Sequence, residues 1–328
     1  MKNIAVIAWW DSSEHDVSLK SAENIILTLE AISEENNYKV FPIILSWKKR
    51  TFTDKNWASF EMDKNDFSLT LNGDKIYFDF AYIIIHWTPW EDWRLQWYLD
   101  MMHIPYSTWW VLNTSIWFNK AVSKSVLAPY GVLSPKGLLI SKDEHIDEQY
   151  IIENLGLPLF VKPNEWWSSF WVTKVKDREM LKDAIKKAFI ECNEVLIESC
   201  IGWREFTCGI LSYNGKIITL PITEIKTNNE FFDYNAKYLW LSEEITPADI
   251  DDNLKHLIQD TSTIIYKKMN CRGIVRIDYI YDDKNLYFLE INLTPWMTKA
   301  SLVPQQLKVG WYSLSEIIKS QIEESCNW

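Results

Sequence analysis

Short apolar runs alternate with amphipathic stretches along the first third of the chain. Residues 3–8 and 81–86 are almost wholly apolar and have the length of buried strands. Between them, apolar residues recur at helical spacing from Ala22 to Ile32, which predicts a helix that ends near residue 34. Further strands are predicted at 40–45, 68–71 and 75–78. Strands that alternate with a helix around an apolar central strand indicate an α/β layer with parallel strands.

The rest of the chain combines amphipathic helices with strand pairs. Helices are predicted at 88–102, 119–130, 177–192, 249–268 and 314–322, and strands flank a loop within 155–175. Residues 205–225 look like a hairpin that turns at Asn214-Gly215. Residues 226–246 carry no sustained period, and a loop of this length inside a compact domain is usually functional or mobile.

Charged residues interrupt the apolar runs of a predicted hairpin at 276–302. Since side chains alternate along a strand, Arg276 and Asp278 share one face of the first strand, and Glu290 and Asn292 share one face of the second. If the turn closes a loop of odd length, Asp278 lies opposite Glu290 and Arg276 opposite Asn292. Buried carboxylates are costly unless they are paired or bind a metal, and oxygen ligands suit Mg²⁺ or Mn²⁺. A structural salt bridge and a metal site fit this spacing equally well.

Other candidate residues are isolated. Lys162 ends an apolar run and could place a charge on a phosphate, although a surface lysine is the commoner explanation for such a residue. Glu205 could bind ribose hydroxyls or simply pair with Arg204. Glu14 and His15 could form an acid–base pair or bind an amine, and a surface capping role fits them as well.

Bulk properties narrow the function classes. The net charge of −11 argues against non-specific binding to nucleic acid or an anionic membrane. No run approaches the roughly 18 apolar residues of a membrane span, and the start has no signal-peptide pattern. The five cysteines show no C-x-x-C spacing and are interpreted as reduced thiols of a cytoplasmic protein.

Seven blocks, in the same order, resemble the D-alanine–D-alanine ligases of the ATP-grasp superfamily. They are SSEHDVSL (12–19), HWTPWEDWRLQWYLD (86–100), LFVKPNEWWSSFW (159–171), LIESCIGWREFT (196–207), FFDYNAKY (231–238), RGIVRIDYI (272–280) and FLEINLTPWMTKASLVP (288–304). The last block is the most specific. The resemblance implies an α/β (α+β) fold of three domains: a Rossmann-like domain at 1–117, a central ATP-grasp subdomain at 118–200 and a C-terminal one at 201–328. Nucleotide would lie between the last two.

The resemblance also implies a role for each residue that matches a motif. The nucleotide-binding residues would be Lys120 and Lys162 on the phosphates, Ser168 in the loop over them, Glu198 at the adenine and Glu205 on the ribose. Two Mg²⁺ ions, or Mn²⁺ in their place, would be held by Asp278, Glu290 and Asn292. The transferred phosphate would meet Arg276 and the lid residue Lys237. The D-alanine sites would be formed by Glu14, His86, Ser169 and Tyr238, with Arg276 and then Ser301 and Leu302 at the second D-alanine.

Tryptophan stands where the family has glycine. The positions are Trp9, Trp10, Trp87, Trp90, Trp93, Trp97, Trp166, Trp167, Trp171, Trp203 and Trp296, in a chain with 9 glycines and 19 tryptophans. Tryptophan at positive φ is strained, and an indole at Trp296 would occupy space beside a developing oxyanion. Glycines recorded as tryptophan, an engineered or recoded chain, and a genuinely altered protein all fit this pattern.

The implied activity is the ATP-dependent ligation of two D-alanines through a D-alanyl phosphate, for peptidoglycan synthesis, by a cytoplasmic homodimer. Tyr238 beside Lys237 favours an amine nucleophile. Two alternatives stay open: a catalytically impaired or non-catalytic ATP-grasp nucleotide-binding protein, and a ligase for another carboxylate–amine pair. No nucleic-acid or membrane partner is expected.

Overall fold

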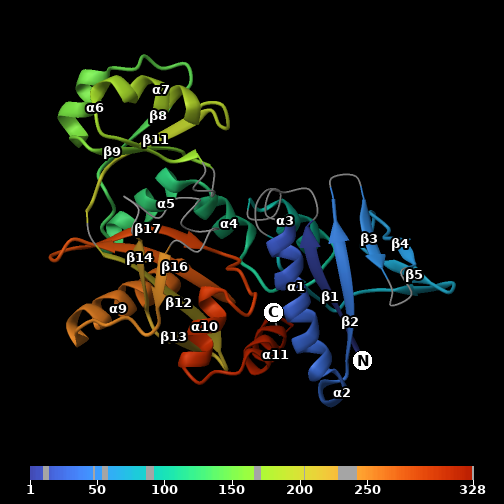
Figure 1. The fold of residues 1–328 in the computed structure, drawn as a ribbon. Helices are drawn as coiled ribbons and strands as arrows, with labels where there is room; N and C mark the ends of the chain where they lie inside the picture. The colour runs from blue at the N-terminus through green and yellow to red at the C-terminus, as the bar shows by residue number, and fades with distance from the viewer. Residues whose placement is uncertain are drawn as a thin grey trace.

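The computed structural model describes residues 1–9, 15–46, 49–53, 58–85, 92–165, 171–202, 204–227 and 242–326. Within these ranges the chain forms three large sheets that follow one another along the sequence, each packed against helices (Figure 1). A small two-stranded sheet of β5 (Leu69–Leu71) and β6 (Asp74–Ile76) accompanies the first. None of the helices in the described ranges has the length and apolar character needed to cross a membrane.

The N-terminal sheet has a parallel centre and antiparallel edge strands. Its order is β4-β3-β2-β1-β7, from β1 (Lys2–Trp9), β2 (Tyr38–Leu45), β3 (Arg50–Thr53), β4 (Ser59–Glu61) and β7 (Phe80–Ile83). β1 pairs in parallel with β2 and β7, which confirms the predicted parallel layer. β1 is apolar on both faces because each face of the sheet packs against a buried apolar cluster. The helices of this part are α1 (His15–Ala31), α2 (Ser33–Asn36) and α3 (Arg94–Met101).

The second sheet is antiparallel and is preceded by two short helices. α4 (Val111–Phe118) and α5 (Lys120–Leu127) lead through a 3₁₀ turn at Ala128–Tyr130 into this sheet. The strands, in the order β10-β9-β11-β8, are β8 (Gly137–Ser141), β9 (Leu159–Pro163), β10 (Thr173–Val175) and β11 (Glu194–Ser199). α6 (Glu148–Leu155) and α7 (Arg178–Ala188) cover it.

The third sheet carries the hairpin that holds the candidate metal ligands. Its strands are β12 (Arg204–Tyr213), β13 (Lys216–Thr219), β14 (Thr223–Thr227), β15 (Ser242–Ile245), β16 (Ile274–Tyr281) and β17 (Leu286–Asn292). Its helices are α9 (Asp252–Lys268), α10 (Leu302–Val309) and α11 (Leu314–Ser325). The predicted turn at Asn214-Gly215 is confirmed, since Tyr213 pairs with Lys216 across it.

The last helix returns to the first sheet. Ile317 and Ile318 of α11 are buried in the same apolar cluster as Ile4 and Ile25, and α11 lies against α1 (Figure 1). The two ends of the chain therefore share one core, which fixes the C-terminal sheet relative to the N-terminal one.

A β-bulge sets the register of the β16–β17 hairpin. Asp278 pairs with Glu290 and Arg276 with Asn292, as predicted. The predicted reason was wrong, because the connecting loop of residues 282–285 has an even length. The pairing shifts between Asp278 and Tyr279, so Leu289 has no partner and Glu290 turns to the face of Asp278. Bulges next to functional sites commonly redirect a side chain in this way.

Among the residues that the structure describes, two tryptophans occupy the left-handed backbone region. Trp93 has φ 84° directly before α3, and Trp311 has φ 60° after α10. At Trp311 the turn is a Schellman motif: its N–H donates to Lys308 O, and the Tyr312 N–H donates to Leu307 O. Glycine is the usual residue at this position because it has no Cβ to strain. The Trp311 side chain is 96% exposed, so little packing offsets the strain.

Trp311→Gly should therefore stabilise the protein. We expect the free energy of unfolding to rise by about 1 kcal/mol, because left-handed φ is costly for any residue with a Cβ. Urea denaturation measures the change. Trp97→Gly is the matched control, since Trp97 is also exposed but lies inside α3, where glycine should destabilise by about 1 kcal/mol. Equal effects at the two positions would contradict the assignment of strain to residue 311.

Candidate functional site

A cluster of lysines surrounds one buried carboxylate on a central strand of the second sheet. Glu198 on β11 is 3% exposed, and each of its oxygens meets a different lysine. Lys162 on β9 places Nζ 2.5 Å from Glu198 Oε2, and Lys124 on α5 contacts Oε1. Lys120, one helical turn before Lys124, is 4% exposed. This part of the structure therefore gathers two buried lysines and the partly buried Lys162 near a single glutamate.

Burial perturbs the ionisation of these groups. Burial lowers the pKa of Lys120 to about 7, and the positive charges of Lys162 and Lys124 act in the same direction. Burial likewise lowers the pKa of Lys124 to about 8, against the opposing effect of Glu198. For Glu198, burial favours the neutral acid, but the ion pairs with Lys124 and Lys162 outweigh it and lower the pKa to about 2. Such a concentration of cations is suited to an anionic ligand.

One asparagine holds the lysine helix against the sheet. The Lys120 N–H donates to the backbone oxygen of Asn164, 3.1 Å away, and the Ala121 N–H donates to the Asn164 side-chain oxygen at 2.9 Å. The Asn164 amide in turn donates to Glu194 Oε2 at 2.9 Å. Asn164 follows directly after β9, so the same segment that carries Lys162 positions the start of α5.

The bulged hairpin brings a second polar group together on the third sheet. Arg276 is buried and donates from Nε and Nη2 to the two carboxylate oxygens of Asp278, at 3.0 and 2.8 Å. The Asn292 side-chain amide donates to Asp278 Oδ2 at 2.9 Å. Burial by itself lowers the pKa of Arg276. The negative charges of Asp278 and then Glu290 have the larger effect, so the pKa is raised. The salt bridge that was one of the two interpretations of this spacing is thus present.

The two polar groups belong to one site. The negative charge of Glu290 on β17 raises the pKa of both Lys120 and Lys124, against the larger effect of burial. The segments around the lysine helix also pack on β17: the Trp117 and Phe288 rings are 6.1 Å apart, and the Phe288 N–H donates to Leu133 O at 2.8 Å. The site therefore spans the second and third sheets.

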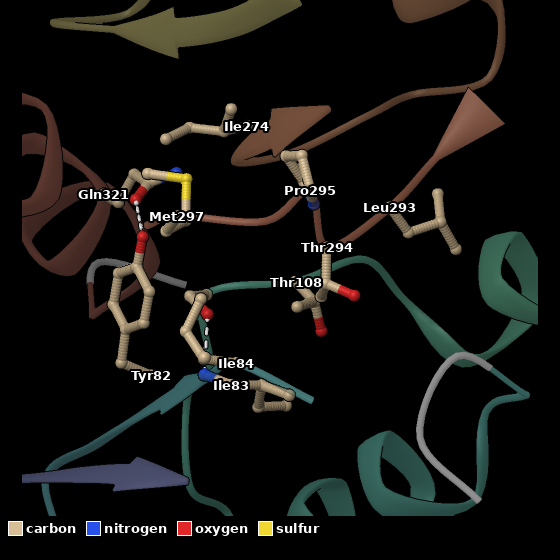
Figure 2. A pocket seen from close by; sticks show the side chains of 11 residues that line it. Tyr82, Ile83, Ile84, Thr108, Ile274, Leu293, Thr294, Pro295, Met297 and Gln321 are labelled. Carbon is tan, nitrogen blue, oxygen red and sulfur yellow. Dashed lines mark hydrogen bonds between the residues drawn. The ribbon is translucent and has the colours of Figure 1, made fainter. Parts of the chain in front are cut away.

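The segment after β17 is fixed to the N-terminal sheet. Thr294 Oγ1 donates to Ile85 O at 2.9 Å, the Met297 N–H donates to Ser21 Oγ at 3.1 Å, and Asn24 donates to Met297 O at 2.7 Å. Figure 2 shows the cavity at this junction, with Tyr82 bonded to Gln321 of α11. Its volume is about 20 Å³, room for a single water, so the junction is closed to larger molecules.

Ser301 and Leu302 form the start of α10 at the far end of this segment. Both are buried, and Ser301 Oγ lies 2.6 Å from Thr298 Oγ1. Farther along the helix, Gln305 donates to Glu244 of β15 at 3.2 Å. α10 thus lies between the segment of residues 294–297 and β15 at the edge of the third sheet.

The donor set of the hairpin is compatible with a hard cation. Among the described residues, no group of three His, Cys, Asp or Glu side chains is arranged to hold a metal. Asp278 and Glu290 nevertheless lie opposite each other on the same face, with the Asn292 amide beside them. Mg²⁺ commonly takes one or two carboxylates and completes its shell with substrate phosphates and water, so two carboxylates are sufficient here.

Several predicted residues cannot be placed. Glu14, His86, Ser168, Ser169, Lys237 and Tyr238 lie outside the described residues. Of the others, Lys120, Lys162, Glu198, Arg276, Asp278, Glu290 and Asn292 come together as described. Glu205 is partly buried on β12, where it pairs with Ile280 of β16 two residues along from Asp278.

Sequence reasoning missed one ion pair and two site residues. Arg204 pairs with buried Glu224 through Nε–Oε1 and Nη2–Oε2 distances of 2.7 and 3.0 Å. Lys124 and Asn164 were not expected in the site. The i, i+4 spacing of Lys124 from Lys120 on a predicted helix was a signal for the first, whereas nothing in the sequence pattern marked Asn164.

Comparison with known proteins identifies the fold. The family described as D-ala D-ala ligase C-terminus matches residues 126–323. A D-alanine–D-alanine ligase of Azobacteroides pseudotrichonymphae is 44% identical, over 98% of this chain and 99% of that protein. The solved D-alanine–D-alanine ligase of Bacillus anthracis, also known complexed with ATP, superposes with a TM-score of 0.80 at 31% identity, over 100% of this chain and 98% of that one. VanG D-Ala:D-Ser ligase of Enterococcus faecalis gives 0.85 at 27% identity, over 98% of each chain.

Two antiparallel sheets that meet at buried lysines, in a fold shared along its whole length with these enzymes, define a ligase of the ATP-grasp class. The chain belongs to the D-alanine–D-alanine ligase family. The family resemblance and the fold class predicted from the seven blocks are thereby confirmed.

Glu198→Gln should destabilise the protein strongly. Loss of the carboxylate leaves Lys124 and Lys162 buried without their counter-charge, and we expect the free energy of unfolding to fall by about 3 kcal/mol. Urea denaturation at neutral pH measures it. Asp183→Asn is the control, because its pair with Lys186 is exposed and should contribute less than about 0.5 kcal/mol. A similar loss in both variants would refute the importance of the buried cluster.

Proposed function

We propose that this protein uses ATP to join two D-alanine molecules into D-alanyl-D-alanine for peptidoglycan precursor synthesis. The observation that carries the proposal is the site at the two sheets, in a chain that belongs to the D-alanine–D-alanine ligase family. Buried cations face a carboxylate pair there, an arrangement suited to phosphoryl transfer, in which positioning and charge neutralisation provide most of the catalysis.

The lysine cluster supports nucleotide binding. We assign Lys120 and Lys162 to the phosphate groups, and Glu198, the ion-pair partner of Lys162 on β11, to the adenine. Glu205 is proposed for the ribose. The related ligase from Bacillus anthracis has been solved with ATP, and the shared fold is consistent with the same ligand here.

The hairpin supports the phosphoryl-transfer step. Asp278, Glu290 and Asn292 would hold two Mg²⁺ ions, or Mn²⁺, which supply charge neutralisation for the phosphates when bound. Arg276 is buried beside them and stays protonated, so it can bind an oxygen of the transferred phosphate. Its bidentate pair with Asp278 holds the guanidinium in a fixed orientation for this role.

The chemistry then follows from the groups on the substrates. The first D-alanine carboxylate attacks the γ-phosphorus of ATP, ADP leaves, and an acyl phosphate forms. The free amine of the second D-alanine attacks that carbonyl, and inorganic phosphate leaves as the peptide bond forms. Ser301 and Leu302, at the N-terminus of α10, would receive the carboxylate of the second D-alanine, because backbone N–H groups there favour an anion. Glu14, His86, Ser169, Lys237 and Tyr238 complete the proposed set.

We also propose the domain boundaries and setting implied by the family. The N-terminal domain would span residues 1–117 and the two ATP-grasp subdomains residues 118–200 and 201–328, with a homodimer working in the cytoplasm. In the structure each proposed unit contains one of the three large sheets. α11 nevertheless packs on the N-terminal unit, so residues at the C-terminus contribute to both ends of the molecule.

Release of phosphate tests the activity. With ATP, Mg²⁺ and D-alanine, a coupled assay should detect ADP and phosphate, and mass spectrometry should detect D-alanyl-D-alanine. Glu290→Gln should lower kcat at least about a hundredfold, since it removes charge at the transferred phosphate. Asp282→Asn, in the exposed turn of the same hairpin, is the control. Turnover with D-serine or D-lactate in place of D-alanine would overturn the substrate assignment, and nucleotide binding without turnover would support a non-catalytic protein.

Nucleotide binding should weaken at alkaline pH. Above its pKa of about 7, Lys120 in the free protein is mostly neutral, and a bound phosphate must draw a proton back onto it. ADP binding should therefore take up protons, and affinity should fall by up to about tenfold per pH unit above neutrality. Calorimetry in buffers of different ionisation enthalpy measures the uptake.

Lys120→Arg provides the matched control for this effect. Arginine stays protonated at every accessible pH, so the variant should lose the part of the uptake that belongs to Lys120. Proton uptake that is unchanged in Lys120→Arg would assign the effect to another group.

A further inference from the structure

Lys124 pairs with a carboxylate of the protein from a helix, whereas Lys162 reaches the same carboxylate from a strand. Its Nζ contacts Glu198 Oε1, and its side chain is 9% exposed, enclosed between α5 and β11. Lys162 approaches the other oxygen, Oε2, at 2.5 Å. Glu198 is thus held symmetrically by two cations from different elements, one on a strand and one on a helix.

The two cations are not equivalent in their surroundings. Lys162 lies at the end of β9, and the chain continues from it towards the phosphate-binding loop proposed at residues 166–169. Lys124 lies in the second turn of α5, a helix whose first residues are fixed by two hydrogen bonds to Asn164. A phosphate that binds Lys162 must therefore compete with Glu198 for it, whereas Lys124 is held against Glu198 by the docked helix.

We propose that Lys124 is a positioning residue for the nucleotide: it keeps the Glu198 carboxylate fixed at the pocket wall when Lys162 leaves that carboxylate for a phosphate. The proposal rests on the proposed function, since it takes ATP or ADP as the ligand. In the free protein Glu198 shares both lysines. In the nucleotide complex Lys124 alone satisfies it, so Glu198 stays in place for the base while Lys162 holds the phosphates.

The buried Glu198 carboxylate needs a cation that stays beside it when Lys162 binds a phosphate. A carboxylate as deeply buried as Glu198 loses its main compensation if its only cation moves away, and an unpaired buried charge is strongly unfavourable. With Lys124 in place, the transfer of Lys162 to a phosphate exchanges one ion pair for another. Without Lys124, the same transfer must expose or neutralise Glu198, and nucleotide binding carries that penalty.

Calorimetric titration with ADP and Mg²⁺ tests the proposal on the full-length protein. Lys124→Met keeps the apolar stem and removes the charge, and we expect ADP binding to weaken by roughly tenfold or more, the scale of one charge-assisted hydrogen bond. Lys124→Arg should restore affinity to within a few-fold, because arginine can keep the ion pair. Lys186→Met on α7 is the matched control, since this lysine is exposed and should leave affinity unchanged.

A second variant separates positioning from folding. If Lys124 acts through Glu198, adding Glu198→Gln to Lys124→Met should weaken ADP binding little further, and the two effects should not add. In steady-state kinetics the KM for ATP should rise in Lys124→Met while the KM for D-alanine stays unchanged. Wild-type affinity for ADP in folded Lys124→Met would overturn the proposal, as would additive effects in the double variant. Absence of ADP binding by the wild-type protein would instead refute the proposed function.

Discussion

The burial of like charges at the junction of two sheets is the constraint on which the site depends. Lys120, Lys124 and Glu198 are withdrawn from water, with Lys162 partly buried beside them. Glu198 and, from the neighbouring sheet, Glu290 only partly offset the burial of the lysine charges and their mutual repulsion. A protein tolerates such an arrangement when a ligand supplies the missing negative charge. The lowered pKa of Lys120 reflects the cost of burial in the free protein. The same cost becomes binding energy once a polyphosphate arrives.

In the third sheet, a β-bulge brings the two carboxylates of the site to the same face. A regular hairpin with an even loop would turn Glu290 away from Asp278, whereas the bulge at Leu289 returns both carboxylates to one face. The packing of Trp117 on Phe288 joins the lysine-bearing part of the chain to this hairpin. Hydrogen bonds from Thr294 and Met297 join the segment after the hairpin to the N-terminal unit.

Much of this arrangement could be predicted from local patterns. The apolar run at β1 and the helical spacing in α1 identified the parallel layer, and strand alternation predicted the partners of Asp278 and Arg276. The eight-residue helices α4, α6 and α10 were not predicted, because two turns carry too little periodicity to stand out.

Ion pairs between residues distant in the sequence could not be predicted either. The Arg204–Glu224 pair depends on how β12 and β14 align, and a lysine such as Lys124 looks like a solvated helical residue until the sheet beneath it is known. The family resemblance supplied the residues proposed to contact substrate, but a residue that acts through another side chain, as proposed for Lys124, leaves no such motif.

The backbone conformation at Trp311 bears on which amino acid belongs at this position. The Schellman turn after α10 favours glycine at that residue, so a ribosome that inserted glycine there would make the more stable chain. The chain holds 9 glycines and 19 tryptophans, an imbalance in the same direction. Every such exchange removes an indole, so the near-ultraviolet absorbance and intact mass of protein purified from its own cells report which amino acid the codon delivers. The geometry of a single helix end thus bears on which amino acid occupies that position.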